Sequence, residues 1–217
     1  NQLLYMRANA PYKTIYDVRK ATEPPKCGST GTASTSYIVT SLLEETLGAK
    51  FNSITGYRDG PEIDLAVEKG EIHCRAVNNE TFFAREPFIT WQKNGLVRVL
   101  VQTGTRRDPR IPEVPTIHEL MNELKTPEAS KRLATVILAS AVFGRPIVAT
   151  PGIPPDRVKM LQAAFRKALA DSELLTEAKN RKLDVDPTAA KELEVLAREV
   201  MTQPPEVIER LKQVLGN

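Results

Sequence analysis

The stretch Lys26-Cys27-Gly28-Ser29-Thr30-Gly31-Thr32-Ala33-Ser34 decides how the rest of the chain is interpreted. It reads as a short strand, a loop with two glycines and four hydroxyl side chains, and the start of an amphipathic helix. Glycines let a backbone turn tightly and approach a ligand closely. The first amides of a helix lack intrahelical partners, and with the helix dipole they favour an anion. The stretch therefore predicts an anion-binding loop; the alternative is a polar turn whose Ser or Thr merely caps the helix.

Two common phosphate-binding motifs do not fit this loop. No Lys-Ser or Lys-Thr pair follows the glycines, so the loop is not a P-loop. The glycine spacing also differs from the G-x-G-x-x-G dinucleotide pattern.

Outward from this stretch, short apolar runs alternate with helical patterns. Strands are predicted at the segments 2–7, 26–27, 51–57, 71–77 and 97–102, and helices begin near Thr14, Ser34, Gly60, Thr116 and Thr126. This alternation predicts a mostly parallel sheet with helices on both faces. Ligands of such sheets bind beyond the carboxyl ends of the strands, where the glycine loop lies.

A second loop at the same predicted edge is also rich in hydrogen-bond donors. Residues 56–61 read Gly-Tyr-Arg-Asp-Gly-Pro, with the proline at the start of a helix. Tyr57 offers a phenol or a stacking face, and Arg58 could grip a carboxylate with two parallel hydrogen bonds. The alternative is an Arg58–Asp59 surface turn beside a half-buried tyrosine.

Composition narrows the class of protein. The 217 residues are 41% hydrophobic and 26% charged, which excludes a disordered chain or a disulfide-rich miniprotein. The net charge of +3 comes without a basic stripe, so we expect no nucleic-acid partner. No window approaches 18 consecutive apolar residues, and residues 1–5 do not resemble a signal peptide. A cytoplasmic protein and a processed or truncated chain both fit.

Catalysis is weakly supported. Cys27 and Cys74 lie in strand-like surroundings, and we interpret them as buried thiols in preference to one disulfide. Cys27 precedes a donor-rich helix start that could lower a thiol pKa, yet no histidine lies near it in the sequence. His73 reads as a sheet histidine and His118 as a solvent-facing one. No residues have metal-ligand spacing, so we expect no catalytic residue, metal or cofactor.

The last third of the chain is rich in helix. Helices are predicted from Pro154, Asp171, Thr188 and Pro204, with one short strand at 183–185.

Five strings together resemble a known family: APYKTIYDV, GSTGTASTSYI, YRDGPEIDLAVEKGEI, VRVLVQTGTRRDPRIPEVPTIHEL and PGIPPDRVKMLQAAFRKALAD. They resemble the substrate-binding receptors of tripartite tricarboxylate transporters, called TctC or Bug proteins. The run R-x-P-x-x-P-x-V-P-T-x-x-E-L, from Arg107 to Leu120, is the most specific element. The chain departs from the family pattern at four positions, namely Ala33, Tyr37, Arg58 and Asp59.

The resemblance implies a periplasmic binding protein type II-like α/β fold whose two lobes close on a small carboxylate. Residues 1–12 would be a hinge strand, residues 13–140 the second lobe, and residues 141–217 a hinge and helical segment that returns to the first lobe. The family's first segment, with its own ligand loop, has no counterpart here, so the first lobe would be incomplete and a homodimer could cover the exposed surface. The resemblance also implies a periplasmic location and membrane transporter subunits as partners. The residues that inherit a ligand-binding role are Gly28, Ser29, Thr30, Gly31, Thr32, Ser34, Tyr57, Arg58 and Gly60.

Three functions follow from these observations. The leading hypothesis is a non-catalytic extracytoplasmic solute-binding protein for a small carboxylate. The second is a truncated receptor-like sensor or interaction module without a transport role. The third is an enzyme that uses Cys27.

Overall fold

One five-stranded sheet organises the computed structural model, which describes residues 1–215. Its strand order is β3-β2-β4-β1-β5, and the strands are β1 (Gln2–Arg7), β2 (Lys26–Gly28), β3 (Asn52–Ile54), β4 (Cys74–Asn78) and β5 (Val97–Gln102). Strand β2 is parallel to β3 and β4, whereas β1 is antiparallel to both β4 and β5. Four strands therefore run in one direction and β1 in the other, which confirms the mostly parallel sheet.

Strand β1 lies inside the sheet, between β4 and β5. Its sequence is apolar at four successive positions because both of its faces are buried. Leu4 and Met6 face one hydrophobic core, and Leu3 and Tyr5 face the other. This alternation follows from the two-residue period of a strand.

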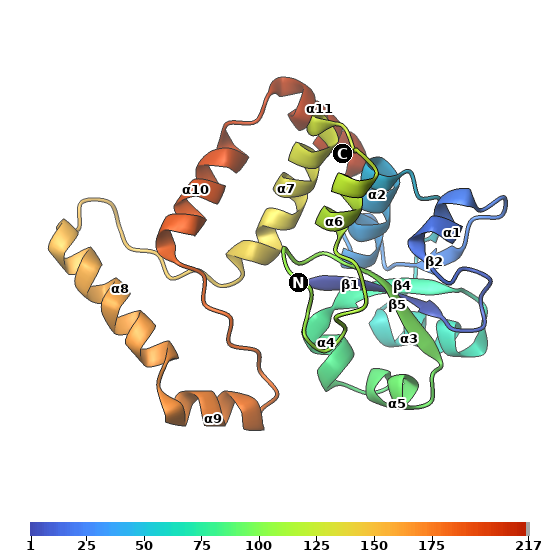
Figure 1. Cartoon of the computed structure of the whole chain (residues 1–217), viewed down its shortest axis with the longest axis horizontal. Helices are drawn as coiled ribbons and strands as arrows, with labels where there is room; N and C mark the ends of the chain where they lie inside the picture. Colours follow the sequence, from blue (N-terminus) through green and yellow to red (C-terminus); the bar gives the residue numbers. More distant parts are fainter. Residues whose placement is uncertain (216–217) are drawn as a thin grey trace. The chain divides into compact units, whose positions relative to one another are not determined.

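Helices cover both faces of the sheet, as predicted (Figure 1). One core is lined by helices α1 (Ile15–Lys20), α2 (Thr35–Leu47), α6 (Ile117–Glu123) and α7 (Glu128–Phe143). The other is lined by α3 (Gly60–Lys69), α4 (Asn79–Ala84) and α5 (Phe88–Lys93). The remaining helices are α8 (Pro155–Leu169), α9 (Ser172–Asn180), α10 (Ala190–Met201) and α11 (Pro205–Val214).

Local signals in the sequence explain where these helices begin and end. Thr14 forms a capping box with Asp17 at the start of α1, and Thr116 does the same at the start of α6. Helices α2 and α3 end at Gly48 and Gly70, whose φ angles of 65° and 81° lie in the left-handed region that favours glycine. The helix starts near Thr14, Gly60 and Thr116 are thereby confirmed.

The two cysteines form a disulfide, and the prediction of buried thiols is wrong. Cys27 on β2 and Cys74 on β4 are directly paired across the sheet, with a Cα–Cα distance of 4.5 Å. Both side chains are buried, as the apolar surroundings predicted. The 47-residue separation concealed the pairing, because only the crossover of the chain brings the two strands together.

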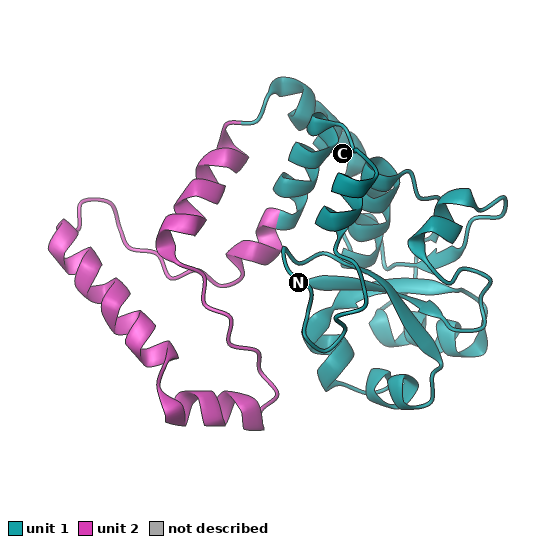
Figure 2. Ribbon diagram, in the orientation of Figure 1, with its two compact units in different colours: residues 1–138, 203–217 teal, residues 139–202 magenta. Residues whose placement is uncertain are grey.

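Contacts divide the chain into two units (Figure 2), residues 1–138 with 203–217 and residues 139–202. In the first unit, α11 packs against α2, and Arg210 forms an ion pair with Glu45. The second unit contains α8, α9 and α10, none of which has a buried residue. The predicted strand at 183–185 is wrong, because this segment forms no strand. Among the helices of residues 1–215, none is long and apolar enough to cross a membrane.

We predict that removal of the disulfide destabilises the fold markedly. A cross-link that closes a loop of 47 residues restricts the unfolded chain and contributes on the order of 4 kcal/mol in the chain-entropy description. The Cys27→Ala/Cys74→Ala variant should therefore unfold at a lower urea concentration, with the unfolding free energy reduced by roughly 2–4 kcal/mol. Thiol titration of the unreduced native chain in urea is the control. Two titratable thiols there would contradict the pairing.

Candidate functional site

Two predicted loops lie side by side because β2 and β3 are parallel neighbours. Gly28 at the end of β2 is paired with Ile54 at the end of β3, and the amide of Ser29 donates to the carbonyl of Ile54 at 2.9 Å. The loops that follow both strands therefore leave the sheet at the same edge. This is the edge at which open α/β sheets bind ligands.

The first loop presents unused backbone donors at the start of a long helix. Helix α2 has 13 residues, and Ser34 caps it by accepting a hydrogen bond from the amide of Tyr37 at 3.4 Å. Capping was the alternative interpretation of this loop, but it uses one amide only. Within residues 1–215, the amides of residues 30–33 make no hydrogen bond. These donors and the positive end of the helix dipole suit an anion.

Ser29 adds an unusual hydroxyl to this loop. Its side chain is 2% exposed, and its Oγ has no hydrogen-bond partner among the described residues. A buried polar atom without a partner costs free energy, so it is rare unless a ligand or water completes it. The Ser29 hydroxyl is thus available to a bound group.

Tyr57, from the second loop, lies against the first. A methyl group placed on Gly28 would come within 3.3 Å of the Tyr57 ring and within 2.6 Å of the Ile63 side chain. Burial raises the pKa of Tyr57, and the nearby Glu71 and Glu62 raise it further. The phenol therefore stays protonated at neutral pH and can donate a hydrogen bond.

Arg58 and Gly60 are placed differently from Tyr57. The Arg58 side chain is 83% exposed, and its Nε lies 3.3 Å from Oδ2 of Asp59 in a surface turn. Asp59 caps α3 by accepting from the amide of Glu62 at 3.0 Å. Gly60 faces inward, where its carbonyl accepts a hydrogen bond from Nη1 of Arg75 at 2.9 Å. The structure brings Tyr57 to the first loop and leaves Arg58 on the surface.

A polar network beneath the second loop was missed by the sequence analysis. Arg75 donates both to the Gly60 carbonyl and to Oδ1 of Asp64, which also accepts from the Tyr5 hydroxyl at 2.8 Å. Burial is the main cause that raises the pKa of Tyr5, and the charge of Asp64 adds to it. The network anchors the first turn of α3. The signal that could have revealed it is the single arginine inside the apolar strand at 71–77.

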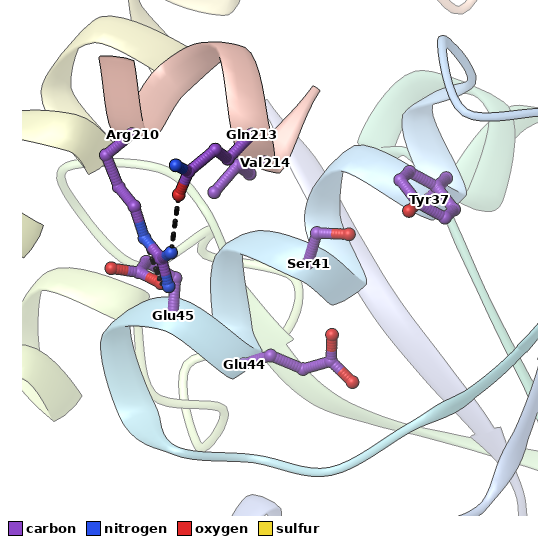
Figure 3. A pocket seen from close by; sticks show the side chains of 7 residues that line it. All are labelled: Tyr37, Ser41, Glu44, Glu45, Arg210, Gln213 and Val214. Carbon is purple, nitrogen blue, oxygen red and sulfur yellow. Dashed lines mark hydrogen bonds and ion pairs between the residues drawn. The ribbon is translucent and has the colours of Figure 1, made fainter. Parts of the chain in front are cut away.

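A cavity of about 340 Å³ lies between α2 and α11 (Figure 3). Ser41 and Glu44 contribute from α2, and Arg210 pairs with Glu45 and donates to Gln213 at 2.8 Å. Glu45 already pairs with the guanidinium of Arg210, and the Glu44 carboxyl group adds a second acidic side chain to the lining, so the cavity is poorly suited to a carboxylate (Figure 3). None of the nine predicted ligand residues lines it.

Candidate catalytic groups have structural roles. Cys27 is in a disulfide and cannot act as a free nucleophile, so the hypothesis of a Cys27 enzyme is wrong. His73 accepts a hydrogen bond at Nδ1 from the amide of Lys26 at 3.0 Å, as a sheet histidine would. His118 is half-buried rather than solvent-facing, and this burial lowers its pKa. In the described part of the chain, no group of three or more His, Cys, Asp and Glu side chains could hold a metal ion.

Comparisons with known proteins place this fold in one family. The family described as "Tripartite tricarboxylate transporter family receptor" matches residues 1–213. A curated relative, the "UPF0065 protein in gbd 5'region" of Cupriavidus necator, is 29% identical over 170 residues, which is 76% of this chain and 45% of the relative. The chain thus spans less than half of that protein.

Solved structures show the same fold. A TctC solute-binding protein from Polaromonas has a TM-score of 0.69 at 19% identity, over 97% of this chain and 66% of that one. A Rhodopseudomonas palustris protein solved with adipate has a TM-score of 0.55 at 16% identity, over 99% and 65% of the two chains. MatC from the same species, solved with malate, has a TM-score of 0.53 at 20% identity, over 99% and 66%. The α/β fold of periplasmic binding proteins is thereby confirmed.

We predict that alanine destabilises the fold at Gly28 but not at Gly31, the two glycines of the first loop. Gly28→Ala should lower the unfolding free energy by about 1–3 kcal/mol, because the new methyl group overlaps Ile63 and Ile72. Gly31→Ala is the matched control, since a methyl group there meets open space and should change stability by less than about 0.5 kcal/mol. Urea denaturation measures both values. Equal losses would show that the loop is packed at Gly31 as well.

Proposed function

The chain belongs to the receptor family of tripartite tricarboxylate transporters, and on this premise we propose that it captures a small carboxylate at residues 28–34 and Tyr57. The observation that carries the proposal is the set of free amides at residues 30–33, at the start of α2, beside the unpartnered hydroxyl of Ser29. Each of these groups donates hydrogen bonds, and together they suit an acceptor that carries negative charge.

Backbone donors can hold a carboxylate without a buried cation. The amides and the helix dipole supply partial positive charge that is fixed in place, so little reorganisation accompanies binding. The exposed hydroxyls of Thr30 and Thr32 and the protonated phenol of Tyr57 add donors around the rim. Gly31 borders open space, which leaves room for the ligand to approach the backbone.

The ligand class that fits best is a dicarboxylate. The first loop suits one carboxylate, and the proteins of similar fold were solved with adipate and malate. A second carboxylate then needs donors from another wall of the cleft. The chain spans about two thirds of those solved structures, and we assign the second wall to the first lobe of the receptor.

We also propose how the chain is divided between the two lobes of the receptor. We assign residues 1–12 to a hinge strand, residues 13–140 to the lobe that carries the loop, and residues 141–217 to a segment that returns to the first lobe before α11 packs back against α2. Support comes from the apolar side chains that α8 and α9 expose, such as Met160, Leu161, Phe165 and Leu175. Amphipathic helices expose such faces when the surface that covers them is not present.

The periplasm is the location that we propose, with the membrane subunits of a tripartite transporter as partners. The Cys27–Cys74 disulfide supports an oxidising compartment, because structural disulfides are rare in the cytosol. The second candidate function is a receptor-like interaction module without a transport role, in which a homodimer covers the exposed helices. The apolar faces of α8 and α9 favour it, and the molar mass in solution distinguishes the two.

We predict that Ser29→Ala separates ligand binding from stability. The Ser29 hydroxyl bonds to nothing in the described chain, so its removal should leave the melting temperature unchanged or slightly raised without ligand. A hydrogen bond to a charged group contributes about 1.5–3 kcal/mol, so affinity for malate or adipate should fall roughly 10- to 100-fold. Titration calorimetry measures the affinity.

Ser36→Ala is the matched control for this variant. Ser36 is also a buried serine, but its Oγ accepts a hydrogen bond from the amide of Ala76 at 3.1 Å. Its loss should lower the unfolding free energy by about 1–3 kcal/mol because that buried amide is left unpaired. A native chain that neither binds malate or adipate nor gains thermal stability from them would count against the proposed function.

A further inference from the structure

The disulfide lies immediately before the proposed anion loop. Cys27 is the residue that precedes Gly28, and its partner Cys74 begins β4. The two side chains are 2% and 0% exposed, so the bond is inside the sheet layer and not on the surface. The bond therefore attaches the base of the loop directly to β4.

Strand β2 is weakly attached on the side of β4. It has three residues, and Cys27 and Cys74 are its only residue pair with β4 in the described ladder. The adjoining hydrogen bonds, from the amide of His73 to the Lys26 carbonyl at 2.8 Å and from the amide of Lys26 to His73, precede the cysteine. The disulfide adds a covalent bond to β4 at Cys27, one residue before the loop begins.

Strand β4 is by contrast firmly held. Its five residues pair one to one with residues 2–6 of β1, in the middle of the sheet. On the opposite side of the loop base, β3 has three residues and supplies the acceptor for the amide of Ser29. A covalent bond to β4 therefore ties the loop to the most extensively paired part of the sheet.

We propose that the Cys27–Cys74 disulfide is a positioning element for carboxylate binding, which holds Ser29 and the amides of residues 30–33 in their binding arrangement. The inference rests on the proposed function. Without the bond, the base of the loop is held by the short β3 and by a single residue pair with β4, and the loop samples arrangements in which its donors no longer converge. Each such arrangement lowers the population competent to bind and weakens the apparent affinity by the same factor.

Two measurements on Cys27→Ala/Cys74→Ala test this inference. We expect affinity for malate or adipate to fall about 10-fold by titration calorimetry. Amide hydrogen exchange should accelerate at Ser29 and Ser34, the loop amides that donate hydrogen bonds, but not in β5. Leu120→Ala is the matched control, because Leu120 is buried on α6 in the core that Cys27 also lines. It should lose comparable stability and keep the native affinity.

The outcomes separate the inference from the proposed function. Equal affinity in the double variant and the native chain, or an equal loss in Leu120→Ala, would overturn the positioning role. A native chain without affinity for either acid would refute the proposed function, and selectively faster exchange at Ser29 and Ser34 in the double variant would then still support the disulfide as the element that orders the loop. Cys27→Ala/Cys74→Val, which keeps more buried volume, repeats the test. If neither variant folds, the bond serves the whole fold and the inference is wrong.

Discussion

The parallel pairing of β2 with β3 is the constraint on which the candidate site depends. It places the ends of two strands, and hence two donor-bearing loops, at one edge of the sheet. Neither loop is a site by itself. The first offers amides that bond to no group within residues 1–215, and the second supplies the ring of Tyr57 against Gly28. Only the common direction of the two short strands brings them together.

Much of the fold could be predicted from local signals. Capping boxes at Thr14 and Thr116 and left-handed glycines at 48 and 70 mark helix ends through interactions within a few residues. Strand segments were recognisable because burial on both faces requires uninterrupted apolar residues, as in β1. These local signals carry no information on which distant segments lie close together, and the predictions failed for such long-range contacts. The disulfide joins residues separated by 47 positions, and the Tyr5–Asp64–Arg75 network joins β1, α3 and β4.

The candidate site shows the same limit at the scale of single residues. Sequence reasoning treated the glycines of the first loop alike, yet Gly28 gives room to Tyr57 and Ile63, and Gly31 borders open space. It also treated Tyr57 and Arg58 as a pair, although the two side chains have different surroundings. Tyr57 is half-buried against the first loop and Arg58 is exposed beside Asp59. Residue types indicated which groups could donate hydrogen bonds, and the backbone determined which of these side chains reach the first loop.

Charge explains why the loop, and not the cavity between α2 and α11, is the better place for a carboxylate. The cavity between α2 and α11 has volume, but Glu45 already neutralises its arginine and Glu44 adds a second carboxyl group. The loop has no formal charge, yet its amides present partial positive charge that no other group in the described chain satisfies. An anion at the loop gains hydrogen bonds without displacing an existing ion pair, whereas an anion in the cavity must compete with one. The net charge of only +3 is consistent with such a site, because fixed backbone dipoles can bind an anion without a cluster of lysines.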